Sequence, residues 1–448
     1  MTPAEIPAPG LRRNANFRRL WLGQAVSAIG DYVFNTTVIL WITVQIAKGL
    51  SWAPVAVSGV VIAAALPAMV VGPVAGVFVD RWNRRRTMLV ADACRALLIA
   101  SLLLLTIPAV RARLSPIATV GLIYLVVAVA SAFAQFFNPS RFAVLGVVVA
   151  PDDRAKASGM FQATSSFATI IGPPLAAPLL FAFGVQWALL INAGSFALSF
   201  GTILAMRLPA EHREQSSARA GFGAEFRTGL RFFRSSPVLV TLAVGAIVAT
   251  LGAGAIGGLG VFFVLDNLHT AAHWLGTLDA AEGAGAVLGA LAAGLIAARL
   301  GATRVFWLGL VLAGLAVVWF SRTETLALAL AALFVGGLMI GAINTAISPL
   351  LLSVTPQHML GRVVAVINPA QQLAGIVSLG LASLLATTVL ARLHVVLAGI
   401  SFNTYDAIFG AGGLIIVIAG LASIVPLRSA ASKPTTGAGE SDAARQPV

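Results

Sequence analysis

Twelve long apolar stretches follow one another along the chain, with little sequence between them. A helix needs about 20 predominantly apolar residues to cross the hydrocarbon core of a bilayer. Only 10% of the residues are charged, whereas a soluble domain usually has about 25%. We therefore expect an all-α membrane protein with twelve transmembrane helices. Their approximate ranges are 20–46, 53–79, 88–110, 116–138, 157–184, 186–206, 238–265, 275–298, 305–321, 326–352, 363–390 and 407–426.

The longest connection between apolar stretches falls after the sixth one and divides the chain into two halves. Within this connection, aromatic residues and arginines fall on opposite faces at helical spacing, which predicts an amphipathic helix lying on an anionic bilayer surface. The end of the chain is rich in Ser, Ala, Gly and Pro and predicts disorder. The expected parts are an N-terminus (1–19), a six-helix bundle (20–206), a linker (207–237), a second six-helix bundle (238–426) and a tail (427–448).

The chain carries a net charge of +13, which by itself would suit a nucleic-acid partner. Most of the basic residues, however, lie in loops on one side of the predicted membrane. The loops on the other side hold only Lys48, Arg111, Arg113, Arg322 and Arg392. Because basic loops stay in the cytoplasm, this bias predicts a multi-pass protein of the inner (plasma) membrane with both termini cytoplasmic. It accounts for the charge without nucleic acid.

The two halves repeat a short pattern at the same place. The segment Gly76–Arg86 follows the second apolar stretch, and the segment Gly294–Arg304 follows the eighth. Glycine and arginine positions agree between the two, and Asn83 matches Gly301, two residue types that tolerate a left-handed backbone. Internal repeats of six helices predict two pseudo-symmetric bundles with a solute site between them near the middle of the membrane.

The first copy of this pattern resembles the signature loop between helices 2 and 3 of the major facilitator superfamily, in which Asn83 stands for the second glycine. The resemblance implies a transporter fold. It also implies that charged residues of this loop take part in gating at the cytoplasmic side. The positions that match are Gly76, Asp80, Arg81 and Arg85.

The fifth apolar stretch resembles the exporter motif that accompanies antiporters in this family. Gly159, Gly172 and Pro173 match the motif, while alanine replaces glycine at three other positions. Small residues let two helices approach closely, and prolines bend a helix by removing backbone donors. Ordinary close packing of helices remains the alternative explanation for this pattern.

A carboxyl group within the first stretch is the leading candidate for proton coupling. Asp31 lies about 11 residues, or roughly 16 Å, from the start of this helix, near the membrane centre. Gln24 and Asn35 share its face, and such a polar stripe must face the bundle interior or a wet cavity. The alternative is a structural buried hydrogen bond. Asp279 and Glu282, one turn apart in the eighth stretch, could bind protons or a cationic solute, or line a wet vestibule.

Other polar residues complete the predicted interior. Asp92 and Arg95 are one turn apart, which predicts a buried ion pair within the third helix. Further side chains are expected to line the solute cavity, together with those on the first helix: Gln135, Asn344 and Gln371. No lysine follows the Gly-rich pattern that binds ATP, so the expected energy source is an ion gradient or none. We expect no cofactor and no bound metal, and no cluster of residues suggests an enzyme.

The opening segment Asn16–Gln24 resembles the facilitator branch that contains macrolide efflux proteins and catecholate-siderophore exporters. This resemblance implies proton-driven export of bulky organic molecules. The expected partner is a small organic solute, and we expect the protein to be a monomer. Many drug antiporters carry an arginine inside helix 4, but the stretch 116–138 has none, so coupling through such an arginine is excluded on this interpretation. An uptake symporter or uniporter and a non-transporting membrane protein remain alternatives.

Overall fold

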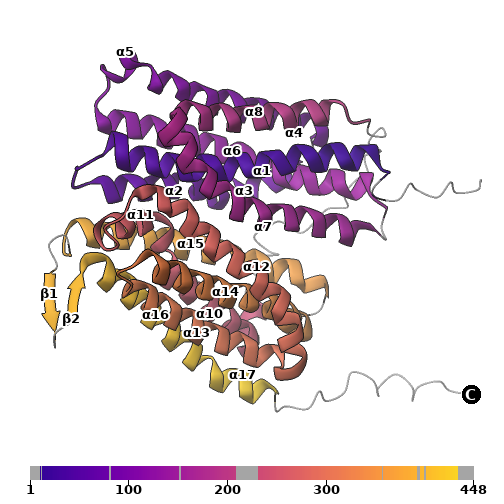
Figure 1. Ribbon diagram of the computed structural model, residues 1–448. Coiled ribbons are helices and arrows are strands. Elements are labelled where there is room, and N and C mark those ends of the chain that lie inside the picture. The colour runs from indigo at the N-terminus through magenta and orange to yellow at the C-terminus, as the bar shows by residue number, and fades with distance from the viewer. Residues whose placement is uncertain are drawn as a thin grey trace, which may run out of the picture.

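The computed structural model describes residues 11, 13–79, 82–150, 153–207, 231–355, 357–390, 394–397 and 400–431. Nearly all of this part is helical (Figure 1). The N-terminal half contains α1 (Ala15–Trp41), η1 (Ile42–Ile46), α2 (Ala53–Val70), α3 (Gly72–Val79), α4 (Arg84–Ser101), η2 (Leu102–Thr106), α5 (Pro108–Arg111), α6 (Pro116–Val148), α7 (Arg154–Pro178), η4 (Leu179–Phe183) and α8 (Val185–Leu204).

The C-terminal half is also built from helices, with one short pair of strands. Its elements are α10 (Pro237–Ala253), α11 (Ile256–Asp266), η5 (Ala272–Trp274), α12 (Leu275–Leu300), α13 (Ala302–Ser321), α14 (Leu326–Val354), α15 (Gln357–Thr387), β1 (His394–Leu397), β2 (Ile400–Asn403), α16 (Thr404–Ala422) and α17 (Ile424–Ala431). Among the described residues, 11 helices are long and apolar enough to cross a membrane. The remaining long helix is α12, which carries Asp279 and Glu282. The predicted membrane protein of twelve helices is confirmed.

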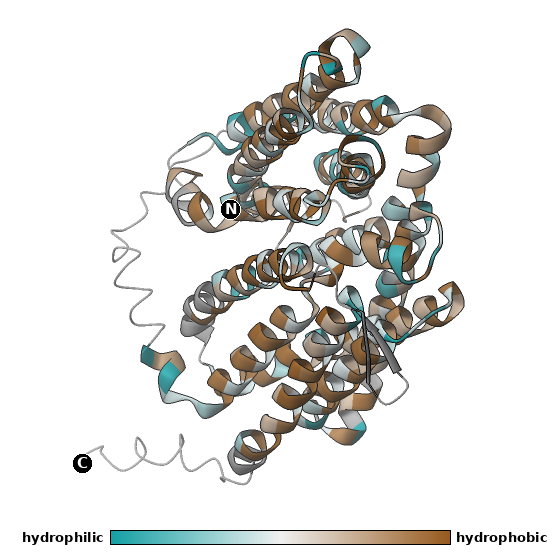
Figure 2. Ribbon diagram, turned by 90° about the vertical axis from the view of Figure 1, so that its left-hand side faces the viewer, coloured by the Kyte–Doolittle hydropathy of each residue, from teal (hydrophilic) through white to brown (hydrophobic). Residues whose placement is uncertain are grey.

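The helices form two groups that lie one above the other (Figure 1), and the view along the helices shows hydrophobic residues on almost all of them (Figure 2). The β1–β2 hairpin lies at one end of the molecule, which we call the hairpin side. The start of α1 and the end of α17 lie at the opposite end, which we call the terminus side. Each side therefore collects alternate loops, as expected for helices that run up and down across a bilayer.

The two halves share one apolar cluster on the hairpin side. It includes Trp41 and Leu189 of the N-terminal half and Leu259, Phe263 and Phe409 of the C-terminal half. On the terminus side, by contrast, each half has a buried cluster of its own. The halves are thus packed together on the hairpin side and have separate cores on the terminus side.

Two contacts between the halves reinforce the packing on the hairpin side. Gly276 of α12 lies directly against the backbone carbonyl of Pro173 in α7, where a larger residue would collide with the main chain. The hydroxyls of Ser58 in α2 and Ser383 in α15 are buried and hydrogen-bonded to each other. Small side chains at these points allow the helices of the two halves to approach closely.

One predicted boundary was wrong. The fourth stretch was expected to end at residue 138, but α6 continues through Pro139 to Val148. A proline is tolerated inside a membrane helix when neighbouring groups satisfy the freed backbone.

The two residues matched between the repeats differ in backbone conformation. Asn83 is not left-handed: its φ is −69°, and its side chain caps α4 by accepting a hydrogen bond from the Arg86 amide. Only Gly301 of this matched pair has a positive φ, of 82°.

Several predicted parts fall largely outside the described residues. The linker helix, most of the N-terminus and most of the tail are in this group. The described start of the tail is helical, because α17 continues to Ala431 beyond the boundary expected at 427. The β1–β2 hairpin was not predicted, since its short strands lie in a single loop between two long helices.

A polar network fixes the start of α16 on the hairpin side. The Asp406 carboxylate accepts hydrogen bonds from the Arg322 guanidinium at 3.2 Å and from the Asn403 amide at 3.1 Å, and it also accepts one from the Asn267 side chain. Its side chain is only 9% exposed. A carboxylate at the first turn also complements the helix dipole.

Asp406→Asn should therefore destabilise the protein by about 1–3 kcal/mol, because a neutral amide cannot replace these charge-assisted hydrogen bonds. The measurement is the melting temperature of the purified protein in detergent. Asp153→Asn is the matched control, since its partner Lys156 is 75% exposed and such a surface pair contributes little. Equal shifts in the two variants would contradict the importance of the network.

Candidate transport cavity

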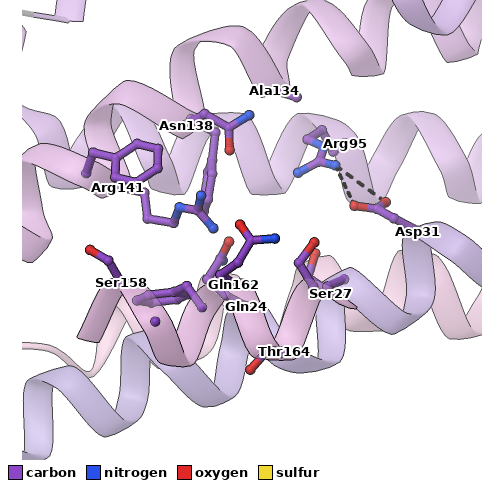
Figure 3. Close-up of a pocket in the computed structure, with 16 residues that line it drawn as sticks. Gln24, Ser27, Asp31, Arg95, Ala134, Asn138, Arg141, Ser158, Gln162 and Thr164 are labelled. Carbon is purple, nitrogen blue, oxygen red and sulfur yellow. Dashed lines mark hydrogen bonds and ion pairs between the residues drawn. The ribbon is translucent and has the colours of Figure 1, made fainter. Parts of the chain in front are cut away.

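A cavity of about 640 Å³ lies inside the N-terminal half, among α1, α4, α6 and α7 (Figure 3). Its wall carries many polar side chains beside apolar ones, although it lies among membrane-spanning helices. The charged side chains on the wall come from three different helices: Asp31 from α1, Arg95 from α4 and Arg141 from α6. Polar groups at this depth must face a wet cavity or each other, because lipid cannot satisfy them.

Asp31 and Arg95 form an ion pair across two helices. The Arg95 Nη2 atom lies 3.2 Å from Asp31 Oδ2 and 3.5 Å from Asp31 Oδ1. The Arg95 guanidinium also stacks on the Phe196 ring of α8, 3.8 Å from its centroid. The Arg95 side chain is 13% exposed and that of Asp31 is 37% exposed. Because Asp31 lines the cavity, its carboxylate is accessible to water although it lies near the centre of its helix.

Arg95 also lies close to a second carboxylate, that of Asp92. Its Nη1 atom lies 4.0 Å from Asp92 Oδ1, one turn away in α4, and the Asp92 side chain is only 1% exposed. The pair predicted within the third helix is therefore present, but the contact with Asp31 is the shorter one. One guanidinium thus lies between two carboxylates, one facing the cavity and one enclosed by protein.

Arg141 lies in a transmembrane helix, contrary to expectation. The fourth transmembrane helix of the chain is α6. Since α6 extends to Val148, it does carry an arginine, Arg141, which lines the cavity. Coupling through a helix 4 arginine was excluded only because the helix was expected to end at residue 138. The Arg141 guanidinium lies over the rings of Phe142 and Phe161, at 4.9 Å and 5.2 Å from their centroids.

Only part of the predicted polar lining belongs to this cavity. Gln24 lines it, and its amide nitrogen donates to the Ser199 hydroxyl at 2.9 Å. The other predicted lining residues lie outside this wall. Of these, Asn35 and Asn344 are exposed, Gln371 is half-buried, and Gln135 donates to the carbonyl of Ser131 in its own helix.

Asp279 and Glu282 lie in the other half of the molecule, in α12, and the structure does not bring them to Asp31. Glu282 lines a smaller cavity of about 300 Å³ in the C-terminal half, whose wall is otherwise mostly aliphatic. The backbone of Gly337 in α14 lies directly against the Glu282 carbonyl, so the two helices are in close contact there. A role of these carboxylates in proton or cation binding stays a prediction.

The signature loop is described only in part. Gly76 lies in α3, whereas Asp80 and Arg81 lie outside the described residues. The Arg85 guanidinium donates to the carbonyls of Ile203 at 3.3 Å and Leu204 at 2.6 Å. It thereby binds carbonyl groups in the last turn of α8, where a cation is favourable.

Residues of the antiporter-like motif in α7 contact the cavity, α1 and α12. Gly159 lines the cavity, Gly172 packs directly against Tyr32 of α1, and the Pro173 carbonyl meets Gly276 of α12. The motif therefore lies between the cavity and the contact of the two halves. A small residue is needed at position 172, because a Cβ atom there would collide with Tyr32.

Comparison with known proteins decides the family. Residues 20–379 and 242–447 match the sequence model of the Major Facilitator Superfamily. The chain belongs to this family. It is accordingly a multi-pass membrane transporter of small solutes, not an enzyme, and the cavity among α1, α4, α6 and α7 belongs to a major facilitator fold.

Several curated relatives match half of the chain or more. The transporter YkuC of Bacillus subtilis is 24% identical over 83% of this chain and 86% of its own length. Multidrug efflux pump Tap of Mycolicibacterium fortuitum is 25% identical over 76% of this chain and 83% of its own. Macrolide efflux protein A of Streptococcus pyogenes is 26% identical over 50% of this chain and 53% of its own.

Solved structures agree on the fold. A point mutant of the nucleoside transporter NupG superposes with a TM-score of 0.73 at 11% identity, covering 92% of this chain and 99% of that protein. A bacterial homologue of the iron transporter ferroportin, in an inward-facing state, gives 0.67 at 14% identity and covers 93% and 99%. At such identities, the likeness is one of fold alone.

Proposed function

We propose that this major facilitator protein is a proton-coupled exporter of bulky organic solutes that works by alternating access. The observation that carries the proposal is the Asp31–Arg95 ion pair in the wall of a cavity among membrane-spanning helices. The names of Tap and of macrolide efflux protein A support efflux as the direction.

The position of Arg95 suggests how Asp31 could bind and release a proton. When Asp31 is charged, Arg95 compensates it at 3.2 Å. When Asp31 binds a proton from the cavity, the guanidinium can form its ion pair with Asp92, which is already 4.0 Å away. A cation that stays compensated in both states removes the large cost of an unpaired charge in the protein interior. Protonation and release at Asp31 can therefore alternate without leaving Arg95 unpaired.

The packing of the two halves supports alternating access. Their shared apolar cluster lies on the hairpin side, and their cores are separate on the terminus side. If basic loops mark the cytoplasm, the terminus side faces the cytoplasm and the conformation is the one closed to the outside. An exporter would load its solute in this state and release it after the halves close on the terminus side.

Everted membrane vesicles with an imposed pH gradient test the proposal. Wild-type vesicles should lose part of the gradient when a suitable macrolide or cationic dye is added, whereas Asp31→Asn vesicles should not, because the variant has no carboxyl group to exchange the proton. Asp153→Asn is the matched control, since Asp153 pairs with Lys156 at the surface. Equal signals in wild type and Asp31→Asn would remove Asp31 from the mechanism. Solute movement together with protons into intact cells would instead favour the uptake alternative.

A further inference from the structure

We propose that Arg141 binds a carboxylate group of the transported solute, so that amphipathic organic anions are a substrate class of this protein. The inference rests on the proposed function, because it concerns the cargo of the same cavity. It starts from the charges on the cavity wall. Asp31 is occupied by Arg95, whereas no ion pair joins Arg141 to any carboxylate within the described part of the chain. Among the charged side chains on the cavity wall, Arg141 is therefore the one without a carboxylate partner in the described residues.

The surroundings of Arg141 leave its hydrogen-bond donors available. Phe142 and Phe161 lie about 5 Å from the guanidinium carbon. Aromatic rings that cover a guanidinium face bind the cation but use none of its in-plane N–H groups. Figure 3 shows the Arg141 side chain extending into the cavity, between Asn138 and Gln162. A planar fork of N–H donors beside a cavity fits a carboxylate, which it can bind through two parallel hydrogen bonds.

The remainder of the cavity suits the other part of such a solute. Phe137 and Phe161 contribute apolar wall, while Ser158 and Gln162 are polar side chains on the same wall. A volume of about 640 Å³ lies within the range of pockets that hold drug-sized molecules. One charged anchor beside aromatic rings favours a molecule with a carboxylate at one end and an aromatic or aliphatic body.

A purely structural role for Arg141 predicts a different outcome. In that case its charge only stabilises the stacked rings, and the cavity has no preference for anions. The two roles are separated by binding measurements on the purified full-length protein in nanodiscs, without a pH gradient. The probes are 1-naphthaleneacetate, its neutral amide 1-naphthaleneacetamide and the cation 1-naphthylmethylammonium, which share one aromatic body.

In the wild type, naphthaleneacetate should bind about tenfold or more tightly than the amide, because only the carboxylate can accept a charge-assisted bidentate contact from the guanidinium. Arg141→Gln should bring the two affinities together, and Arg141→Lys should keep part of the difference, since lysine retains the charge without the fork. Arg113→Gln, at an exposed loop position, is the control and should keep the full ratio. Melting temperatures of the unliganded variants show whether each one is folded.

Equal affinity for the acetate and the amide in the wild type, or an unchanged ratio in folded Arg141→Gln, would overturn the inference. Preference for the cation would overturn it as well. The proposed function is judged separately by the vesicle assay. Gradient dissipation without anion preference contradicts only the role of Arg141, whereas anion preference without any proton-linked transport contradicts only the proton coupling.

Discussion

Arg95→Gln is expected to lower the stability of the protein by roughly 3–5 kcal/mol, the range found when one partner of a buried ion pair is removed. The reason is that the Arg95 guanidinium forms ion pairs with both Asp31 and Asp92. Without the guanidinium, the enclosed Asp92 carboxylate would lose its cation in an environment that water cannot reach. The measurement is thermal unfolding of the purified protein in detergent, with Arg113→Gln as the matched surface control.

Second substitutions show which carboxylate causes the loss. Asp92→Asn combined with Arg95→Gln should recover most of the stability, because the Asp92 side chain is 1% exposed and its charge is the costly one. Asp31→Asn combined with Arg95→Gln should recover less, since Asp31 is 37% exposed and water in the cavity can solvate it. The opposite order would show that Asp31, not Asp92, depends more on Arg95.

The fold could be predicted from the sequence because the bilayer fixes the length and composition of each span. The long apolar stretches satisfy this requirement one at a time, so no contact between helices has to be known. Even α12 was found, although it carries Asp279 and Glu282 within an otherwise apolar stretch. The β1–β2 hairpin was missed because a short loop carries no comparable constraint.

The candidate site was only partly predictable, because it depends on contacts between helices. Helical spacing predicted that Asp92 and Arg95 lie near each other, since both are on α4. The shorter contact of Arg95 with Asp31 joins residues that are far apart in the sequence, and no periodicity reports it. Arg141 was missed for a local reason: the helix was expected to end before Pro139, although it continues through this residue. A basic residue soon after a proline in an apolar stretch was the signal that could have found it.

Gly276→Leu is expected to separate the two halves on the hairpin side. A side chain at this position would meet the backbone of Pro173 and Pro174 in α7, which no change of rotamer can relieve. Forcing extra atoms into a packed contact costs about 1–3 kcal/mol, and this would lower the population of the closed arrangement roughly 5- to 150-fold. Because alternating access requires both arrangements, transport should fall as well.

Cross-linking across the same side measures this shift. Ser58 and Ser383 are in direct contact, so cysteines at both positions should form a disulfide readily when Cys94, the single native cysteine, is replaced by serine. In this background Gly276→Leu should slow disulfide formation about tenfold. This factor corresponds to a packing cost of about 1.4 kcal/mol. Gly121→Leu is the matched control, because a side chain at Gly121 in α6 would meet nothing within 4 Å. Equal rates with leucine at 276 and at 121 would mean that the contact between α7 and α12 does not hold the halves together. Slower cross-linking only with leucine at 276 would identify this contact as the one that closes the hairpin side.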